Sequence, residues 1–272
     1  GYSFKDTMYQ TSSTSSGGKQ EASGNATIGG ANPAQYGYGS LTGSIATDFT
    51  SSTPSYVGGF NASINGSGFF VTSASNKEVT LDPANTKTTT AEMKKNNFAY
   101  TRVGQFSVDA NGYIVDANHN FVYGFQPDSL TEPTKYGDGG KKLVALRAPA
   151  ADNTGAVALT GSPVFTGFAA QLKSVEIGAD GIVKGIIDNK TPGTGGAPAQ
   201  VTSTSIVLGK VAVASFQNQE GLTKAGNNTF NAGVGDNTGY ISATMPGEGS
   251  TPTLMAGYLE ASNVDLAKEF SD

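Results

Sequence analysis

The chain has 272 residues, with 37 glycines, 14% charged residues and no cysteine, which disfavours a helical bundle and favours an all-β fold of short strands and many turns. The missing cysteines exclude disulfides, thiolate metal sites and cysteine nucleophiles. The net charge of −5 without a basic cluster disfavours nucleic acid and anionic membranes as partners, and no apolar stretch approaches the roughly 20 residues of a membrane span.

The N-terminal part of the chain divides into three stretches. Phe4, Met8 and Tyr9 place apolar side chains in an opening stretch that we interpret as an ordered tether. Sequence rich in Ser, Thr and Gly follows to about residue 30 and is typical of a surface loop. Larger and small residues then alternate in part over residues 36–49, as expected for strands with one buried face.

A meander is the clearest unit in the next part of the chain. Residues 60–71 continue the strand pattern, and Asn65-Gly66 supplies a tight-turn dipeptide. Residues 106–125 predict three antiparallel strands, with the turn dipeptide Asn111-Gly112 after the first strand and a polar turn at 118–120 after the second. We therefore expect this stretch to form consecutive hairpins.

The second half of the chain opens with an irregular segment and returns to strands. Residues 126–169 are rich in turn-forming and polar residues. Residues 175–185 then predict a hairpin that turns at Asp180-Gly181. The Gly-, Pro- and Thr-rich stretch 191–198 is typical of a surface loop, and an apolar strand is expected over 206–216.

The last residues change to a helical pattern. Ser262 or Asn263 fits the N-cap position, and Asp265 lies where the helix dipole favours a carboxylate. The chain ends at Asp272 after about two turns, which is too short for a stable isolated helix. We therefore expect this segment to be only the start of a longer helix.

Four segments of the chain resemble signature segments of one family. They are G-G-F-N-A-S-I-N-G-S-G-F-F-V at 58–71, Y-T-R-V-G-Q-F-S-V-D at 100–109, G-K-V-A-V-A-S-F-Q-N-Q-E-G-L at 209–222 and G-Y-L-E-A-S-N-V-D-L-A-K-E-F at 257–270. In this order they are similar to segments of the bacterial flagellar rod and hook proteins. Asn61 stands where the family usually has Asp, and Ser63 where it usually has Ala. The last segment is most similar to that of the hook members.

The resemblance implies a discontinuous all-β domain of the flagellar hook type, formed by residues 1–125 and 170–272, with the start of a C-terminal helix. The similarity fades over residues 126–169, which we expect to form a short inserted lobe on which little of the main core depends. In the family, terminal helices pack at the inner wall of a tube, and both ends of this chain look trimmed at that boundary. The chain alone is therefore expected to be monomeric.

The function implied by the resemblance is structural. The chain would be a subunit of the flagellar hook, a self-assembling helical tube that bends while it transmits torque from the rod to the filament. The implied partners are identical subunits, the hook cap, the rod and the hook–filament junction proteins. The implied place is outside the cell, after export without a cleaved signal peptide, since no charged stretch followed by an apolar one opens the chain.

Three alternatives to the hook reading remain open. The distal rod protein belongs to the same family and forms a straight, rigid tube, and the short segment at 126–169 fits it because rod subunits lack a large inserted domain. From other classes, a β-rich surface adhesin module would share the Gly, Ser and Thr content, and a β-helical polysaccharide enzyme would share the turns.

The residues that we expect at the junction between the β-domain and the terminal helices come from the opening tether and from the last two of these segments. They are Phe4, Met8, Tyr9, Glu220, Leu259, Glu260, Asn263, Val264, Asp265 and Leu266. No catalytic, cofactor-binding or metal-binding residue is predicted.

Several residues could suggest chemistry, but each has a simpler structural reading. Asp116 opens a D-x-N-x-N stretch like that of a calcium loop, which lacks Gly at the sixth and Glu at the twelfth position. His119, the single histidine, lies inside the same turn. Asp109, Asp116 and Asp180 flank turns, where Asp bonds the local backbone. Together with Glu220 they are the carboxylates that a glycosidase would draw upon.

Overall fold

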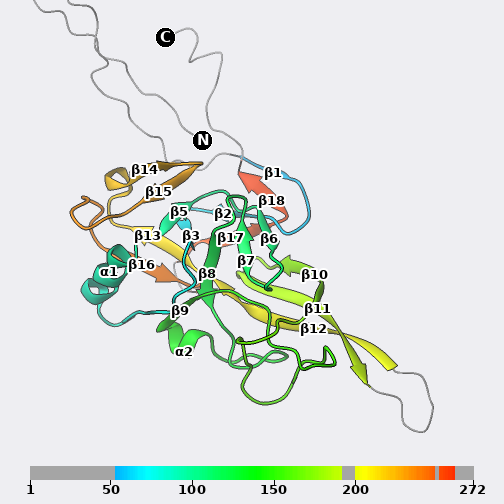
Figure 1. Cartoon of the computed structure of the whole chain (residues 1–272). Helices are drawn as coiled ribbons and strands as arrows, with labels where there is room; N and C mark the ends of the chain where they lie inside the picture. Colours follow the sequence, from blue (N-terminus) through cyan, green and yellow to red (C-terminus); the bar gives the residue numbers. More distant parts are fainter. Residues whose placement is uncertain (1–52, 192–199, 249–250, 261–272) are drawn as a thin grey trace, which may run out of the picture. The chain divides into compact units, whose positions relative to one another are not determined.

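The fold is given by a computed structural model, which describes residues 53–191, 200–248 and 251–260 (Figure 1). Its elements are β1 (Pro54–Tyr56), β2 (Ala62–Asn65), β3 (Phe69–Ser73), β4 (Val79–Thr80), α1 (Thr86–Lys95), β5 (Ala99–Thr101), β6 (Phe106–Val108), β7 (Ile114–Asp116), β8 (Phe121–Phe125), α2 (Gly137–Gly140), β9 (Lys142–Ala145), β10 (Leu172–Ile177), β11 (Ile182–Thr191), β12 (Gln200–Val211), β13 (Val213–Phe216), the 3-10 turn η1 (Gln219–Gly221), β14 (Thr223–Gly226), β15 (Thr229–Asn231), β16 (Ile241–Thr244), β17 (Thr253–Ala256) and β18 (Tyr258–Glu260). Strands thus dominate the described residues, and the prediction of an all-β fold is confirmed.

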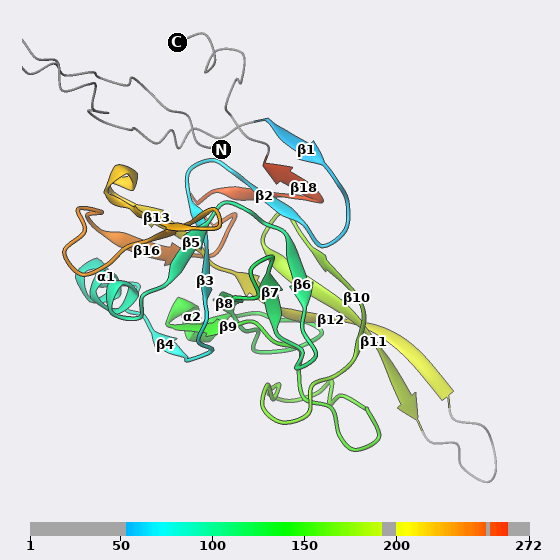
Figure 2. The ribbon, with the colours of Figure 1, turned by 45° about the horizontal axis from the view of Figure 1, so that its top comes forward.

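The strands form one large and two small antiparallel sheets. The large sheet follows the order β10-β11-β12-β8-β3-β5-β15-β14, with β13 and β16 attached at β3, β7 and β6 at β8, and β9 between β8 and β4. β1 pairs with β18, and β2 pairs with β17. Figure 2 shows these four short strands together at one side of the large sheet.

The core is densest around β3, which is covered on both faces. All five residues of this strand are buried, and β5, β8 and β13 pair along its edges. Phe70 meets Phe106 edge to face with 5.1 Å between ring centroids, and Phe69 meets Phe216 at 5.6 Å. Such pairs contribute about 0.5–1.5 kcal/mol each beyond their burial. The unbroken apolar start of β3 is what a strand buried on both faces requires.

One substitution in this core is expected to be stabilising. Tyr100→Phe should raise the free energy of unfolding by about 1 kcal/mol, because it removes a buried hydroxyl that has no hydrogen-bond partner within the described part of the chain. Burial also raises the pKa of Tyr100 far above its ordinary value, so the hydroxyl stays protonated.

Tyr123 provides the matched control for that substitution. Its hydroxyl donates to the carbonyl of Ser75 at 2.6 Å, so Tyr123→Phe should lower the free energy of unfolding by about 1 kcal/mol. Urea unfolding followed by circular dichroism measures both variants. A loss of stability in Tyr100→Phe would contradict the prediction, because it would mean that the hydroxyl has a partner.

The predicted hairpins are confirmed. β6 pairs with β7 and β7 with β8, which is the expected meander, and β10 pairs with β11. Gly112 and Gly181 occupy their turns with φ of +80° and +76°, a conformation that only glycine adopts at little cost. The predicted apolar strand over residues 206–216 is divided between β12 and β13.

The sequence predicted a tight turn at Asn65-Gly66, but this dipeptide does not close a hairpin. β2 pairs with β17, whereas β3 joins the large sheet, so the chain passes from one sheet to another at this point. Gly68, with φ of +150°, lies so close to β13 that a Cβ atom would be 2.6 Å from Cγ1 of Val213. The turn therefore serves a crossing between two sheets, and glycine is required there for space.

Helix α1 is an element that the sequence analysis missed. Asn85 caps it, since its side-chain oxygen accepts from the amides of Lys87 and Thr88 at 3.2 and 3.3 Å. Within the helix only Thr89 and Met93 are buried. Its sequence T-K-T-T-T-A-E-M-K-K has almost no apolar periodicity, which is why the helix was missed. The cap residue and the basic last turn were signals for a helix.

The segment 126–169 contributes more to the core than its sequence suggested. Within it, β9 pairs with β4 on one side and β8 on the other. Leu130, Leu146 and Val157 belong to the main hydrophobic cluster, and Leu143 is fully buried. The expectation that little of the core depends on this segment is wrong, because its apolar residues lie in a sheet strand and in loops that cover the same core. The division of the domain at its two boundaries stays a prediction.

Several predicted elements lie outside the described residues. They are the tether, the loop and the strands before residue 50, most of the loop at 191–198, and the C-terminal helix. Among the residues that the structure does describe, no helix is long and apolar enough to cross a membrane.

Candidate functional site

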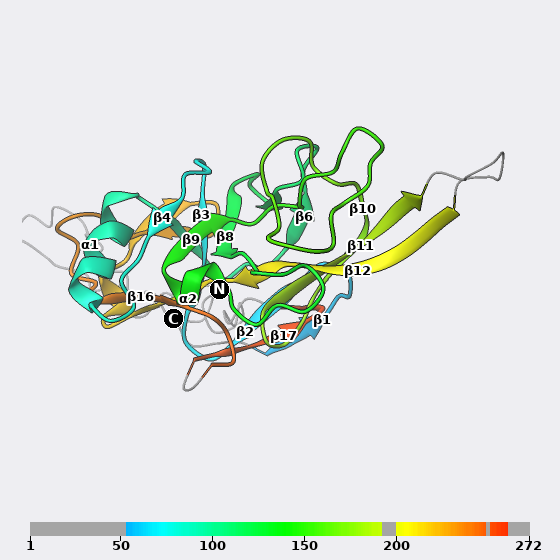
Figure 3. The same ribbon diagram turned by 90° about the horizontal axis from the view of Figure 1, so that it is seen from below.

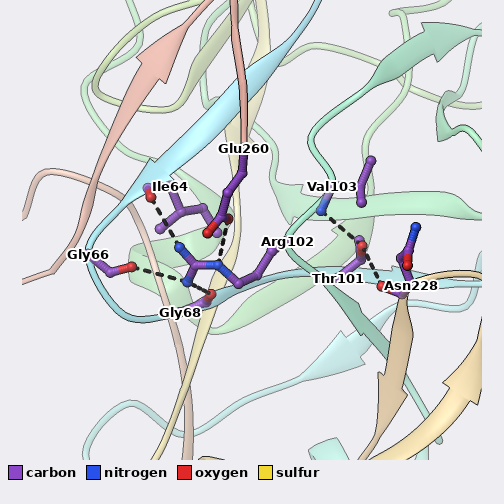
Figure 4. Close-up of polar contacts among 8 residues, drawn as sticks. All are labelled: Ile64, Gly66, Gly68, Thr101, Arg102, Val103, Asn228 and Glu260. Atoms are coloured by element: carbon purple, nitrogen blue, oxygen red, sulfur yellow. Dashed lines mark hydrogen bonds and ion pairs between the residues drawn. The ribbon is translucent and has the colours of Figure 1, made fainter. Parts of the chain in front are cut away.

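The site that gathers the sequence motifs is centred on Arg102, directly after β5 (Figure 4). Its Nε donates to Oε2 of Glu260 at 2.7 Å. The Arg102 and Glu260 side chains are only 13% and 6% exposed. This is a buried ion pair that joins the end of β5 to the end of β18, and we call it the Arg102–Glu260 clasp.

The other nitrogens of Arg102 bind the backbone of the β2–β3 crossing. Nη1 donates to the carbonyls of Gly66 and Gly68 at 3.1 and 2.9 Å, and Nη2 donates to that of Ile64 at 3.4 Å. Gly66 and Gly68 have φ of +120° and +150°, so the crossing can bend its carbonyls onto one guanidinium. A planar fork of five donors suits this task, whereas the point charge of lysine does not.

The residues on both sides of Arg102 fix its position. Thr101 Oγ1 donates to the carbonyl of Asn228 at 3.1 Å and accepts from the amide of Val103 at 3.0 Å. Gly104 lies against β2, where an added Cβ would be 1.8 Å from the carbonyl oxygen of Ala62. The spacing of the Y-T-R-V-G segment thus has a steric reason.

The clasp lies at the base of the β1–β18 ribbon. In that ribbon Pro54 is opposite Glu260, and Tyr56 is opposite Tyr258 with the two rings edge to face at 5.2 Å. Gly257 ties the ribbon to the start of β2, since its amide donates to the carbonyl of Asn61 at 2.7 Å. The described chain therefore begins and ends at one point of the domain.

The predicted junction residues are only partly brought together here. Leu259 and Glu260 lie in β18 at the clasp. Glu220 is exposed in η1, after β13, and belongs to a different part of the sheet. The remaining predicted residues, Phe4, Met8, Tyr9, Asn263, Val264, Asp265 and Leu266, lie outside the described residues.

Arg102 is the residue that the site prediction missed. The chain has only two arginines, Arg102 and Arg147, among its 17 basic residues. Both are largely buried, and both donate to backbone carbonyls. The use of arginine at two positions, where the other 15 basic residues are lysines, was the available signal, because a buried cation with several acceptors is better served by arginine.

The candidate carboxylates lie in turns. In three loops the Oδ1 atom of an Asp accepts from the amides two and four residues later, at 2.7–2.9 Å, with Asn111 and Tyr113 as donors for Asp109, Asn118 and Asn120 for Asp116, and Thr154 and Ala156 for Asp152. Asp180 accepts from the amide of Ile182 at 3.1 Å. The interpretation of Asp109, Asp116 and Asp180 as turn residues is confirmed, and Asp152 has the same role. In the described part of the chain no group of three His, Cys, Asp or Glu residues could hold a metal ion.

These loops lead to a prediction for His119. It takes the fourth loop position with φ of +62°, where the Asp109 loop has Gly112. A left-handed conformation costs an L-residue about 1–2 kcal/mol, and the extra chain entropy of glycine offsets about half of this. His119→Gly should therefore raise the free energy of unfolding by up to about 1 kcal/mol, measured by urea or thermal unfolding.

Gly112→Ala is the control at the equivalent position. Its added Cβ would lie 2.6 Å from the Cβ of Ala169 in a backbone conformation unfavourable to alanine. It should lower the free energy of unfolding by more than about 1 kcal/mol. A comparable loss in His119→Gly would mean that the histidine side chain itself stabilises the loop.

Comparison with known proteins places this architecture in one class. Residues 90–185 match the family model described as the flagellar hook protein FlgE/F/G D1 domain. The chain is similar to the flagellar basal-body rod protein FlgG of Bacillus subtilis, with 28% identity over 270 residues, which cover 99% of this chain and 74% of that protein.

Hook proteins match over shorter stretches. The flagellar hook protein FlgE of Treponema pallidum is 34% identical over 115 residues, which cover 42% of this chain and 24% of that protein. FlgE of Escherichia coli is 36% identical over 98 residues, which cover 36% and 21% respectively. The chain thus spans about three quarters of the rod protein and less than a quarter of these hook proteins.

Three of the four sequence motifs therefore meet at one buried ion pair within an antiparallel β-domain. Over these stretches the chain is similar to proteins of the flagellar rod and hook family. Its relatives are named as structural parts of the flagellum, which also confirms the expectation that it is not an enzyme.

Proposed function

We propose that the chain is a repeating subunit of the flagellar hook, a helical tube of identical copies that transmits torque from the rod to the filament. The observation that carries the proposal is the Arg102–Glu260 clasp, where three of the four family-like segments meet. The first and last described strands, β1 and β18, are paired beside this ion pair, so force that reaches either strand enters the domain here. A buried ion pair with several hydrogen bonds suits a joint that transmits force.

The distal rod is the second candidate, and a specific observation favours it. The rod protein matches the chain almost from end to end, whereas the hook proteins match only part of it. The similarity of E-A-S-N-V-D-L-A-K-E to hook members favours the hook. Either assignment makes the chain a subunit of the same axial structure.

The proposal extends to the organisation of the domain and its surroundings. Residues 1–125 and 170–272 form the tube-wall domain with 126–169 as an insertion, and Asn263, Val264, Asp265 and Leu266 begin a helix at the inner wall. The partners are identical copies, the rod, the hook cap and the junction proteins. We place the subunits outside the cell.

Immunogold labelling of isolated hook–basal bodies with an antibody against this chain tests the proposal. Label along the curved segment supports the hook, and label confined to the segment below it supports the distal rod. Deletion of the gene should abolish motility in either case. Absence of label from both segments, with motility retained in the deletion strain, would overturn the proposal.

A further inference from the structure

Two places in the chain carry the dipeptide Asn-Gly, at Asn65-Gly66 and at Asn111-Gly112. This dipeptide can modify itself. Glycine has no Cβ, so its backbone nitrogen can reach the side-chain carbonyl carbon of the asparagine before it. The structure gives the two dipeptides opposite surroundings, and their reactivity should therefore differ.

The reaction is a loss of ammonia followed by an uptake of water. The glycine nitrogen gives up its proton and forms a bond to Cγ of the asparagine, while the bond between Cγ and Nδ2 breaks. Ammonia leaves with the proton, and a cyclic imide remains. Water then opens the imide at either of its carbonyl carbons. The product is aspartate or isoaspartate, and in isoaspartate the backbone runs through Cβ and Cγ of the former side chain.

The Asn111-Gly112 dipeptide is fixed on both sides of its peptide bond. The amide of Gly112 donates to the carbonyl of Asp109 at 3.0 Å, and the carbonyl of Asn111 accepts from Nε of Arg147 at 3.0 Å. Gly112 is also buried, and an added Cβ there would lie 2.6 Å from Cβ of Ala169. The attacking nitrogen is thus engaged as a donor, and the turn has no room to rearrange.

The Asn65-Gly66 dipeptide faces water at the end of a strand. Asn65 is the last residue of β2, which lies beside β17 at one border of the domain (Figure 3). Asn65, Gly66 and Ser67 are all exposed. Outside its immediate chain neighbours, the nearest atom to an added Cβ at Gly66 would be Cβ of Pro252, at 3.6 Å. Water therefore reaches this dipeptide, and the chain has space to rearrange.

The two glycine amides also differ in their hydrogen bonds. Within the part of the chain that the structure describes, the amide of Gly66 donates to no acceptor. The amide of Gly112 must first leave the carbonyl of Asp109, which costs free energy before any new bond can form. Hydroxide can therefore remove the amide proton of Gly66 more easily than that of Gly112.

We propose that Asn65 is a site of spontaneous deamidation in the folded protein, with water as the co-reactant and aspartate or isoaspartate at position 65 as the products. Asn111 is protected by the turn around it. Exposure, space and an amide without an acceptor all favour the reaction at the first dipeptide, and all three are lost at Gly112.

The modification alters the crossing that Arg102 holds. The guanidinium donates to the carbonyls of Ile64 and Gly66, on either side of Asn65 (Figure 4). Isoaspartate adds an atom to the backbone between these carbonyls, so both can no longer meet one rigid fork of donors. Aspartate leaves the backbone unchanged, and its side chain is exposed. The isoaspartate form should therefore weaken the Arg102–Glu260 clasp, whereas the aspartate form should keep it.

Peptide mapping by mass spectrometry measures both sites in one sample. The purified chain is incubated at mildly alkaline pH and digested at intervals, and fragmentation locates the mass increase of each amide that becomes a carboxylate. Asn65 should convert at least about tenfold faster than Asn111, a ratio that corresponds to a barrier difference of about 1.4 kcal/mol. An isoaspartate-specific methyltransferase should label the peptide that contains position 65.

Two controls separate the effect of the fold from that of the sequence. In guanidinium chloride the fold is lost, and Asn65 and Asn111 should convert at similar rates. In the folded chain, Asp109→Ala removes the carboxylate that accepts from the amides of Asn111 and Tyr113. This variant should speed the conversion of Asn111 and leave that of Asn65 unchanged.

Three results would each overturn the proposal. They are equal rates at the two sites of the folded chain, faster conversion of Asn111, and an intact Asn65 after a time in which the unfolded chain has reacted fully. Hydrogen exchange tests the effect on the clasp. The amides of β18 should exchange faster in chains with isoaspartate at position 65 than in Asn65→Asp, and equal exchange in the two would remove this effect.

Discussion

A variant in which a short Gly-Ser linker replaces residues 126–169 is expected to show no cooperative unfolding transition. The replacement removes β9 from between β4 and β8 and deletes Leu130, Leu143 and Leu146 from the core. Truncating one buried leucine costs about 2–5 kcal/mol. Three such losses are comparable to the whole stability of a domain, about 5–15 kcal/mol. Far-UV circular dichroism during urea unfolding measures the transition, since the chain has no tryptophan.

A smaller deletion in the same segment serves as the control. Thr160, Gly161 and Ser162 are exposed, and an added Cβ at Gly161 would meet no other atom within 4 Å. Deleting Gly161 and Ser162 should change the free energy of unfolding by less than about 1 kcal/mol. If the full replacement keeps a cooperative transition of similar slope, residues 126–169 form a separable lobe, as their sequence suggested.

Local rules allowed the hairpins to be predicted. The dipeptides Asn111-Gly112 and Asp180-Gly181 specify turns by themselves, because glycine takes the left-handed conformation that each turn needs. The strands beside them follow from alternation and β-branched residues. All of this information lies within about ten residues of sequence, so no knowledge of distant contacts was required.

Elements whose place depends on distant partners could not be predicted in the same way. β9 is short, and its partners β4 and β8 are supplied from elsewhere in the chain. The Asn65-Gly66 turn has the sequence of a hairpin, but β17 takes the place beside β2. The residues of a turn do not determine which strand will pair with the strand before it, because pairing depends on burial across the whole sheet.

Only one of the two residues of the Arg102–Glu260 clasp was predicted from the sequence. Glu260 was expected at the junction because it stands in a recognisable segment, and the structure places it at the end of the last described strand. Its partner Arg102 lies 158 residues earlier, so no local pattern connects the two. The family-like segments are separate in sequence, and their common purpose is visible only where Arg102 binds both Glu260 and the β2–β3 crossing.

Arg102→Met is expected to lower the free energy of unfolding by about 3–5 kcal/mol, the usual cost of removing one member of a buried ion pair. The loss is large because Glu260 would remain buried without its cation, and the carbonyls of Gly66 and Gly68 would lose their donor. Urea unfolding of the variant against the original chain measures it.

Lys95→Met is the control, because Lys95 pairs with Glu92 at 3.6 Å on the surface, where the lysine side chain is 73% exposed. That variant should lose at most about 0.5 kcal/mol. Equal small losses in the two variants would mean that the clasp contributes no more than a surface pair.

A double-mutant cycle decides whether the clasp acts as a joint or only as packing. Glu260→Gln alone keeps an acceptor for Arg102 but removes the charge. Combined with Arg102→Met, it should lower the free energy of unfolding by less than the sum of the two single changes.

Hydrogen exchange shows where in the domain the clasp acts. In Arg102→Met the amides of β18 should exchange faster than those of β3, because the clasp fixes the last strand to the domain. Uniform acceleration across both strands would instead show that Arg102 stabilises the whole domain and has no special hold on the chain end.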